Sequence, residues 1–132
     1  MNKLFVDTSA WIAHFNSNDD FHSAAEKLFL QRPELATSNA VLHETIAHLA
    51  SRVNKKAAIV AGEFILETGV VELITLSLQD EQKSWNKLKQ INFQMSFVDI
   101  SNVIVMKAND LTDIFSFDSD FTKLNLNVVP TI

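Results

Sequence analysis

Short apolar runs alternate with longer segments of helical periodicity along the chain, and this alternation limits the possible folds more than any other feature. The runs at residues 4–6, 35–37, 70–76, 114–117 and 128–129 have the length of buried strands. Most are separated by helical segments of about ten residues, which is the kind of crossover that parallel neighbouring strands require. The pattern therefore predicts an α/β fold, with a mainly parallel sheet of four to five strands covered by helices on both faces.

The predicted helices have recognisable ends. They cover residues 9–15, 21–31, 39–52, 55–68, 78–90 and 99–107. Pro33 stops the second of them, and Gly69 follows the fourth in the position where a left-handed residue often ends a helix. Ser77 and Asp80 have the spacing of a capping box at the start of the fifth.

Composition indicates one compact domain over residues 1–132, because 47% of the residues are hydrophobic and only 2 Gly and 2 Pro are present. The absence of cysteine excludes disulfides, thiolate zinc sites and cysteine nucleophiles, and it suits a reducing cytosol. No apolar run reaches the ~18 residues of a membrane helix. We therefore expect a cytoplasmic protein without a membrane span.

The formal net charge of -5 argues against unaided binding of a polyanion. A nucleic-acid substrate would need local basic patches, or cations held by the acidic residues themselves. Coverage of the acidic surface by a basic partner is a third possibility.

Carboxylates recur where strands end or helices begin. Asp7 follows the first strand, Glu44 lies early in the helix after the second, Asp99 opens a late helix and Asp118 follows a late strand. Taken alone, Asp7 could simply be a helix N-cap, with Thr8 or Ser9 as the alternative cap. If all four acids meet at one edge of a parallel sheet, their mutual repulsion requires a divalent cation, and hard oxygen ligands select Mg²⁺ or Mn²⁺.

The order and spacing of these acids resemble those of PIN-domain ribonucleases, and most closely the toxins of bacterial VapBC-type toxin–antitoxin pairs. The resemblance is carried by Val6-Asp7-Thr8-Ser9, by Glu44, by Phe97-Val98-Asp99, and by the run from Ser116 to Phe121. It implies a three-layer α/β/α sandwich and a Mg²⁺- or Mn²⁺-dependent endoribonuclease. It also implies a homodimer that is inhibited by a small DNA-binding antitoxin.

Site residues carry over by position. The resemblance implies that Asp7, Glu44, Asp99 and Asp118 are the catalytic and metal-binding acids. Asp118 is preferred to Asp120 because it lies just beyond the predicted strand. The auxiliary candidates are Asp120, Ser9, Ser116 and Asn102; for the two serines, local capping is an equal alternative. Asn102 lies one turn after Asp99, where its side chain could bind a water on the metal.

The expected reaction is hydrolysis of an RNA phosphodiester by a metal-activated water. The family's products carry 5′-phosphate and 3′-hydroxyl ends, whereas attack by the RNA's own 2′-hydroxyl would give a 2′,3′-cyclic phosphate. The sequence does not identify the RNA target.

Two basic groups could bind RNA. Arg52, Lys55 and Lys56 surround one helix junction, while Lys83, Lys87 and Lys89 share a helix with Trp85. An aromatic ring among cations can stack unpaired bases. The alternative is that the lysines are only solvated and that Trp85 belongs to the core or to a dimer contact.

The histidines do not form a zinc motif. His43 and His48 are five residues apart, so they diverge by about 140° around a helix, whereas zinc-binding pairs are four apart. We expect both at the surface or in an interface, and we assign no role to His14 or His22.

Two other functions remain open from the sequence. The same scaffold could be a catalytically silent RNA-binding or protein-interaction module, which an assay with and without EDTA would reveal. A receiver-like or phosphatase domain would need a second acid beside the first strand and a late lysine. Thr8 and Ser9 follow Asp7 instead, which argues against that class.

Overall fold

The computed structural model describes residues 2–131, and its strands match the predicted runs closely. They are β1 (Leu4–Val6), β2 (Leu35–Ser38), β3 (Val71–Ile74), β4 (Asp113–Phe115) and β5 (Asn127–Val129). All four neighbouring pairs are parallel, and the strand order is β3-β2-β1-β4-β5. The prediction of an α/β fold with a parallel sheet is confirmed.

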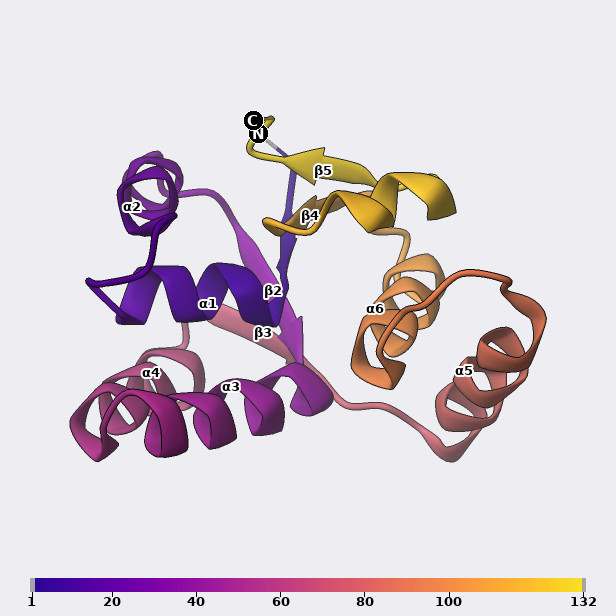
Figure 1. Cartoon of the computed structure of the whole chain (residues 1–132), viewed down its shortest axis with the longest axis horizontal. Helices are drawn as coiled ribbons and strands as arrows, with labels where there is room; N and C mark the ends of the chain where they lie inside the picture. Colours follow the sequence, from indigo (N-terminus) through magenta and orange to yellow (C-terminus); the bar gives the residue numbers. More distant parts are fainter. Residues whose placement is uncertain (1, 132) are drawn as a thin grey trace.

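Helices cover both faces of the sheet (Figure 1). They are α1 (Thr8–Phe15), α2 (His22–Leu30), α3 (Asn39–Arg52), α4 (Lys55–Glu67), α5 (Leu78–Gln90), α6 (Phe97–Ala108) and the short 3₁₀ helix η1 (Ser119–Leu124). Helices α1 to α4 lie on one side of the sheet, and α5, α6 and η1 lie on the other. This three-layer arrangement agrees with right-handed crossovers. Strands β2 and β3 extend the sheet in one direction from β1, whereas β4 and β5 extend it in the opposite direction, so their connecting helices lie on opposite faces.

The short strands form the centre of the hydrophobic core. Phe5, Val6, Ala36, Ile114 and Phe115 are fully buried, as expected for strands that have helices on both faces. Aromatic rings extend this core between the sheet and the first helices. Trp11 stacks on Phe29 with ring centroids 5.5 Å apart.

Three predicted boundaries were wrong by two residues. Strand β3 ends at Ile74 rather than Leu76, whose backbone N–H donates to Asn39 Oδ1 at 3.0 Å. The sixth helix starts at Phe97 rather than Asp99, because the Ser96 side chain accepts the Asp99 backbone N–H at 3.1 Å and so caps the helix. Strand β4 ends at Phe115 rather than Phe117. The Phe117 N–H donates to Ser9 Oγ at 3.0 Å, which takes this residue out of the strand ladder.

Other predicted helix ends are confirmed. The predicted capping box of Ser77 and Asp80 is present at the start of α5. The structure also shows Ser38 capping α3 and Asn54 capping α4. Gly69 has a positive φ of 74°, as its predicted position after a helix requires.

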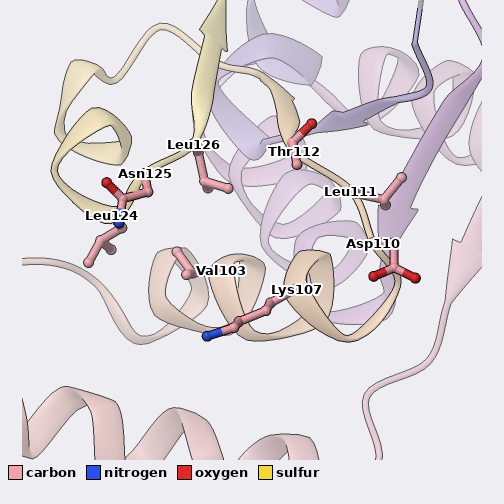
Figure 2. A pocket seen from close by; sticks show the side chains of 8 residues that line it. All are labelled: Val103, Lys107, Asp110, Leu111, Thr112, Leu124, Asn125 and Leu126. Carbon is pink, nitrogen blue, oxygen red and sulfur yellow. The ribbon is translucent and has the colours of Figure 1, made fainter.

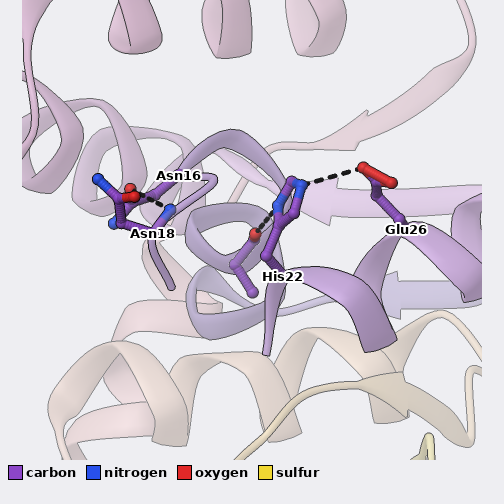
Figure 3. Close-up of polar contacts among 5 residues, drawn as sticks. Asn16, Asn18, His22 and Glu26 are labelled. Carbon is purple, nitrogen blue, oxygen red and sulfur yellow. Dashed lines mark hydrogen bonds and ion pairs between the residues drawn. The ribbon is translucent and has the colours of Figure 1, made fainter. Parts of the chain in front are cut away.

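The connection between α1 and α2 gives His22 a structural role (Figure 3). Its Nδ1 lies 2.8 Å from the Ala13 carbonyl oxygen, and its Nε2 lies 3.0 Å from a carboxylate oxygen of Glu26. In the same turn, Asn16 Oδ1 accepts the backbone N–H of Asn18. His22 therefore joins the end of α1 to the first turns of α2.

Within residues 2–131, no helix combines the length and the apolar character that crossing a membrane demands.

Candidate active site

The strand order reverses between β1 and β4, and ligands of open parallel sheets bind outside the carboxyl ends of the strands at such a point. Asp7 follows β1 directly, and Ser116 follows β4. The Asp7 N–H donates to the Phe115 carbonyl at 3.0 Å, so the two strand ends are held side by side.

A cleft of about 370 Å³ opens at this edge. Its lining residues are Asp7, Thr8, Ser9, Ile12, Glu44, His48, Ser96, Asp99 and Asp118. They come from the ends of β1 and β4 and from α1, α3 and α6. The four acids predicted from separate segments thus lie in a single cleft.

Asp7 is the most enclosed of these acids, with 3% of its surface exposed. Its Oδ1 accepts from Asn102 Nδ2 at 3.0 Å, and its Oδ2 accepts from Ser116 Oγ at 2.9 Å and from Ser9 Oγ at 3.1 Å. Burial raises the pKa of this carboxyl, and the bonds from Ser116, the Thr8 backbone and Ser9 oppose that shift. Asp7 occupies the N-cap position of α1 without any side-chain capping bond, so its carboxylate is held for something other than capping.

Asp99 has a pKa raised to about 7. Burial is the main cause, and the negative charges of Asp7, Asp118 and Glu44 add to it, while Ser96 acts in the opposite direction. Charge coupling of this kind requires the carboxylates to lie near one another. The site therefore concentrates negative charge in a partly dehydrated cleft.

Asp118 and Asp120 differ in whether they face the cleft. Asp118 lines the cleft, and its Oδ1 accepts the Asp120 N–H at 2.9 Å at the start of η1. The Asp120 carboxylate lies 3.0 Å from Lys123 Nζ instead. The Asp118 backbone N–H also donates to Ser116 Oγ at 3.0 Å, so this serine connects Asp7 to the Asp118 turn.

The donor set suits a hard divalent cation. The cleft offers carboxylate and hydroxyl oxygens, and two buried oxygens nearby, Thr8 Oγ1 and Asn102 Oδ1, have no hydrogen-bond partner within residues 2–131. No three His, Asp or Glu side chains of the described chain already surround one point as metal ligands. Mutual repulsion keeps the carboxylates apart when no cation lies between them. Glu44, Asp99 and Asp118 are partly exposed, so their side chains have room to turn toward a bound cation.

Asn102 is fully buried and donates to Asp7 through its Nδ2. Its predicted contact with a water on the metal stays a prediction. Ser9 and Ser116 both donate to the Asp7 carboxylate, so their hydroxyls hold this acid in place and are not confined to local capping.

The predicted RNA-binding residues lie outside the cleft. Arg52, Lys55, Lys56 and Lys83 are exposed, and Lys87 is partly buried. Trp85 is 50% exposed and meets Phe97 edge to face, with ring centroids 6.5 Å apart. Trp85 is therefore not a core residue.

His48 is a cleft residue that was not predicted from the sequence. It lies one helical turn after Glu44 on α3, and that four-residue spacing is the signal that could have revealed it. His43 faces a separate apolar groove with Leu42, Ile46, Ala47 and Leu66. Both histidines were predicted to lie at the surface or in an interface, and the structure places them in two different pockets.

A second cavity of about 370 Å³ lies at the opposite edge of the sheet, between α6 and the turns that precede β4 and β5 (Figure 2). Its lining is largely aliphatic, with Lys107 and Asp110 as its charged side chains. It shares no residue with the acidic cleft.

Comparison with known proteins gives concordant matches. A family model of the PIN domain matches residues 4–126. The 23S rRNA-specific endonuclease VapC20 of Mycobacterium tuberculosis is 36% identical over 121 residues, which cover 90% of this chain and 92% of that protein.

Solved structures agree with this match. The crystal structure of VapC20, described as a Sarcin-Ricin loop cleaving toxin, has a TM-score of 0.88 at 33% identity and covers 93% of this chain and 95% of its own. VapBC2 from Rickettsia felis, bound to a DNA fragment from the promoter, has a TM-score of 0.69 at 16% identity and covers 96% of both chains. FitAcB from Neisseria gonorrhoeae has a TM-score of 0.63 at 14% identity and covers 95% of both. The last two similarities concern the fold alone.

Proposed function

The chain belongs to the PIN-domain family, and from this premise we propose that it is a divalent-metal-dependent endoribonuclease, the toxin of a VapBC-type toxin–antitoxin pair. The observation that carries the proposal is the single cleft in which Asp7, Glu44, Asp99 and Asp118 meet at the switch point of the sheet. The 36% identity to an rRNA-specific endonuclease supports the choice of RNA as substrate and makes 23S rRNA the first target to test.

Asp7, Glu44, Asp99 and Asp118 would hold Mg²⁺ or Mn²⁺, because carboxylate oxygens are the ligands that these ions prefer. When bound, such a cation activates water for attack and offsets the charge that develops on the phosphodiester oxygens. Asp7 is the fixed member of the set, since both of its oxygens are held by hydrogen bonds. Glu44, Asp99 and Asp118 are less enclosed and can adjust to the substrate.

The reaction is a hydrolysis. The oxygen of water bonds to phosphorus, the bond from phosphorus to the 3′-oxygen breaks, and a proton ends on the departing oxygen. A carboxylate oxygen of the cleft that does not bind the cation can accept the proton that water releases. The products then carry 5′-phosphate and 3′-hydroxyl ends.

The decisive experiment incubates purified protein with 23S rRNA and Mg²⁺ or Mn²⁺, with and without EDTA, and maps the cut ends. We expect EDTA-sensitive cleavage that leaves 5′-phosphates. A 2′,3′-cyclic phosphate would contradict the mechanism. An absence of any metal-dependent cleavage would favour a catalytically silent PIN module.

RNA binding would use the exposed basic residues outside the cleft. Arg52, Lys55 and Lys56 form one such group, and Lys83 and Lys87 form another on the helix of Trp85. The ring of Trp85 is accessible, and Lys89 Nζ lies 5.9 Å from its centroid. Phosphate contacts by these cations would make RNA affinity fall with added salt.

Apolar surface is available for the proposed homodimer and antitoxin. Helix α4 exposes Ile59, Val60 and Leu66, and Leu66 also lines the groove next to α3. Light scattering of the free protein tests the dimer, and co-purification with the protein encoded by an adjacent reading frame tests the antitoxin. Because the substrate is cellular RNA, the proposal also places the protein in the cytoplasm.

A further inference from the structure

One face of α3 leads from the acidic cleft to a basic surface. Glu44, His48 and Arg52 follow at intervals of four residues, so each lies about 6 Å further along the helix axis than the one before. Glu44 and His48 line the cleft, and Arg52 is exposed in the last turn of α3. Lys55 and Lys56 follow at once, in the first turn of α4.

His48 is the one residue among the nine described cleft residues that can carry a positive charge. A bound divalent cation would neutralise the scissile phosphate but not its neighbours along the strand. Those neighbours would otherwise meet four carboxylates and a chain of net charge -5. A phosphate next to the cut site therefore needs a protein donor, and His48 has the required place and chemistry.

The His48 ring is also free to bind. The side chain is exposed, and no hydrogen bond or ion pair within residues 2–131 engages its ring nitrogens. His22 differs, since both of its ring nitrogens have acceptors within 3.0 Å. His48 is thus not needed for the fold in the way that His22 is.

The basic surface on α5, formed by Lys83 and Lys87, is connected less directly to the cleft than the one at the end of α3. Neither Lys83 nor Lys87 lines the cleft, and α5 itself supplies none of the cleft's lining residues. Helix α3, in contrast, supplies a carboxylate, a histidine and an arginine in one row. The charge pattern therefore favours α3 as the path of the RNA.

We infer that the RNA strand leaves the acidic cleft along α3, with His48 donating a hydrogen bond to the phosphate adjacent to the scissile one and Arg52 contacting the phosphate beyond it. This inference rests on the proposed function and assigns His48 as a substrate-binding residue.

Binding of RNA without cleavage provides the test. In an Asp99→Asn background, which silences the reaction, the affinity for a labelled stem–loop RNA of the 23S sarcin–ricin sequence is measured by fluorescence anisotropy. We expect His48→Ala to weaken binding about five- to tenfold, in line with the loss of one hydrogen bond at a solvent-exposed position. His48→Arg should restore most of that affinity, because it keeps a hydrogen-bond donor at the same place and its guanidinium is positively charged. Arg52→Ala should also weaken binding and make it less dependent on salt.

Two matched variants serve as controls. His43→Ala removes an exposed histidine from the other face of the same helix and should leave the affinity unchanged. The double change Lys83→Ala and Lys87→Ala should have less effect than Arg52→Ala. The inference is overturned if His48→Ala binds as tightly as its parent, or if only the α5 lysines matter. Cleavage of 23S rRNA by the unaltered protein is measured in parallel, so that a failure of the nuclease proposal is seen separately from a failure of the α3 path.

Discussion

Asp7 combines deep burial with three hydrogen-bond donors, and this combination predicts opposite effects on activity and stability. Asp7→Asn keeps the shape of the side chain but removes its charge. We expect cleavage to fall about 100-fold or more, as when a preorganised electrostatic group is lost. We also expect the metal-free protein to melt at the same or a higher temperature, because a buried charge is removed. Cleavage rates and thermal melts in EDTA check both effects, and wild-type cleavage by this variant would refute the role of Asp7.

We expect Asn102 to affect the reaction through its hydrogen bond to Asp7. Asn102→Leu removes the donor to Asp7 Oδ1 while keeping a side chain of similar size in a fully buried position. Loss of such a positioning contact should weaken metal affinity about 10- to 100-fold. Calorimetric titration with Mn²⁺ measures this directly. Asn109→Ala, at the end of the same helix, removes only a bond to the Val105 carbonyl and should leave metal affinity unchanged.

At the residue scale, motif order was enough to select four acids that the structure brings into one cleft. Asp7 and Asp118 follow strands whose ends must share an edge, so their convergence follows from the parallel sheet. The donation from Asn102 to Asp7 and the entry of His48 into the cleft depend on how α6 and α3 pack over that edge. The four-residue spacing from Glu44 points to His48, but spacing within a single helix does not show how that helix packs over the edge of the sheet.

Helix α6 carries Asp99 in its first turn, so its N-cap affects both stability and the site. Ser96→Ala removes the acceptor for the Asp99 N–H, and we expect it to cost about 1 kcal/mol of the free energy of unfolding. Because Ser96 lines the cleft beside Asp99, the same change should also lower cleavage. Ser77→Ala at the cap of α5 is the matched control, with a similar loss of stability and unchanged activity per folded molecule. Denaturant melts and cleavage rates distinguish the two, and equal loss of activity in both would argue against a local role for Ser96.

At the element scale, type and order were predictable because apolar periodicity and caps are local signals. Ser77 with Asp80 is an example in which sequence alone specifies the bonds that form. The end of β4 was not predictable, since Phe117 has the apolar character of a strand residue. Its N–H is instead bound by Ser9, a partner 108 positions away in the chain. Only tertiary contacts of this kind decide where such a strand stops.

At the scale of the whole molecule, the acidic cleft links folding, pH and metal binding. The unfolded chain should release the Asp99 proton near pH 3.8, the ordinary pKa of an aspartate, whereas the folded protein holds it up to about 7. Between these values the folded state binds more protons, so the free energy of unfolding of the metal-free protein should fall as pH rises through this range. The raised pKa of Asp7 acts in the same direction. After allowance for solvent screening of a partly exposed group, Asp99 should account for about 1–2 kcal/mol of the decrease.

Divalent cations should reverse this trend. Metal binding needs deprotonated carboxylates, so the gain in melting temperature on adding Mn²⁺ should grow from about pH 5.5 to about pH 8 and should increase with metal concentration. Asp99→Asn removes the proton-binding group, and this variant should show both a flatter pH dependence in EDTA and a smaller response to Mn²⁺. Thermal melts across pH, in EDTA and in Mn²⁺, measure the pH dependence and the metal response of both the wild-type protein and the Asp99→Asn variant. A metal response that is independent of pH, or that survives intact in the Asp99→Asn variant, would place the cation away from these carboxylates and would separate the cleft from the proposed nuclease chemistry.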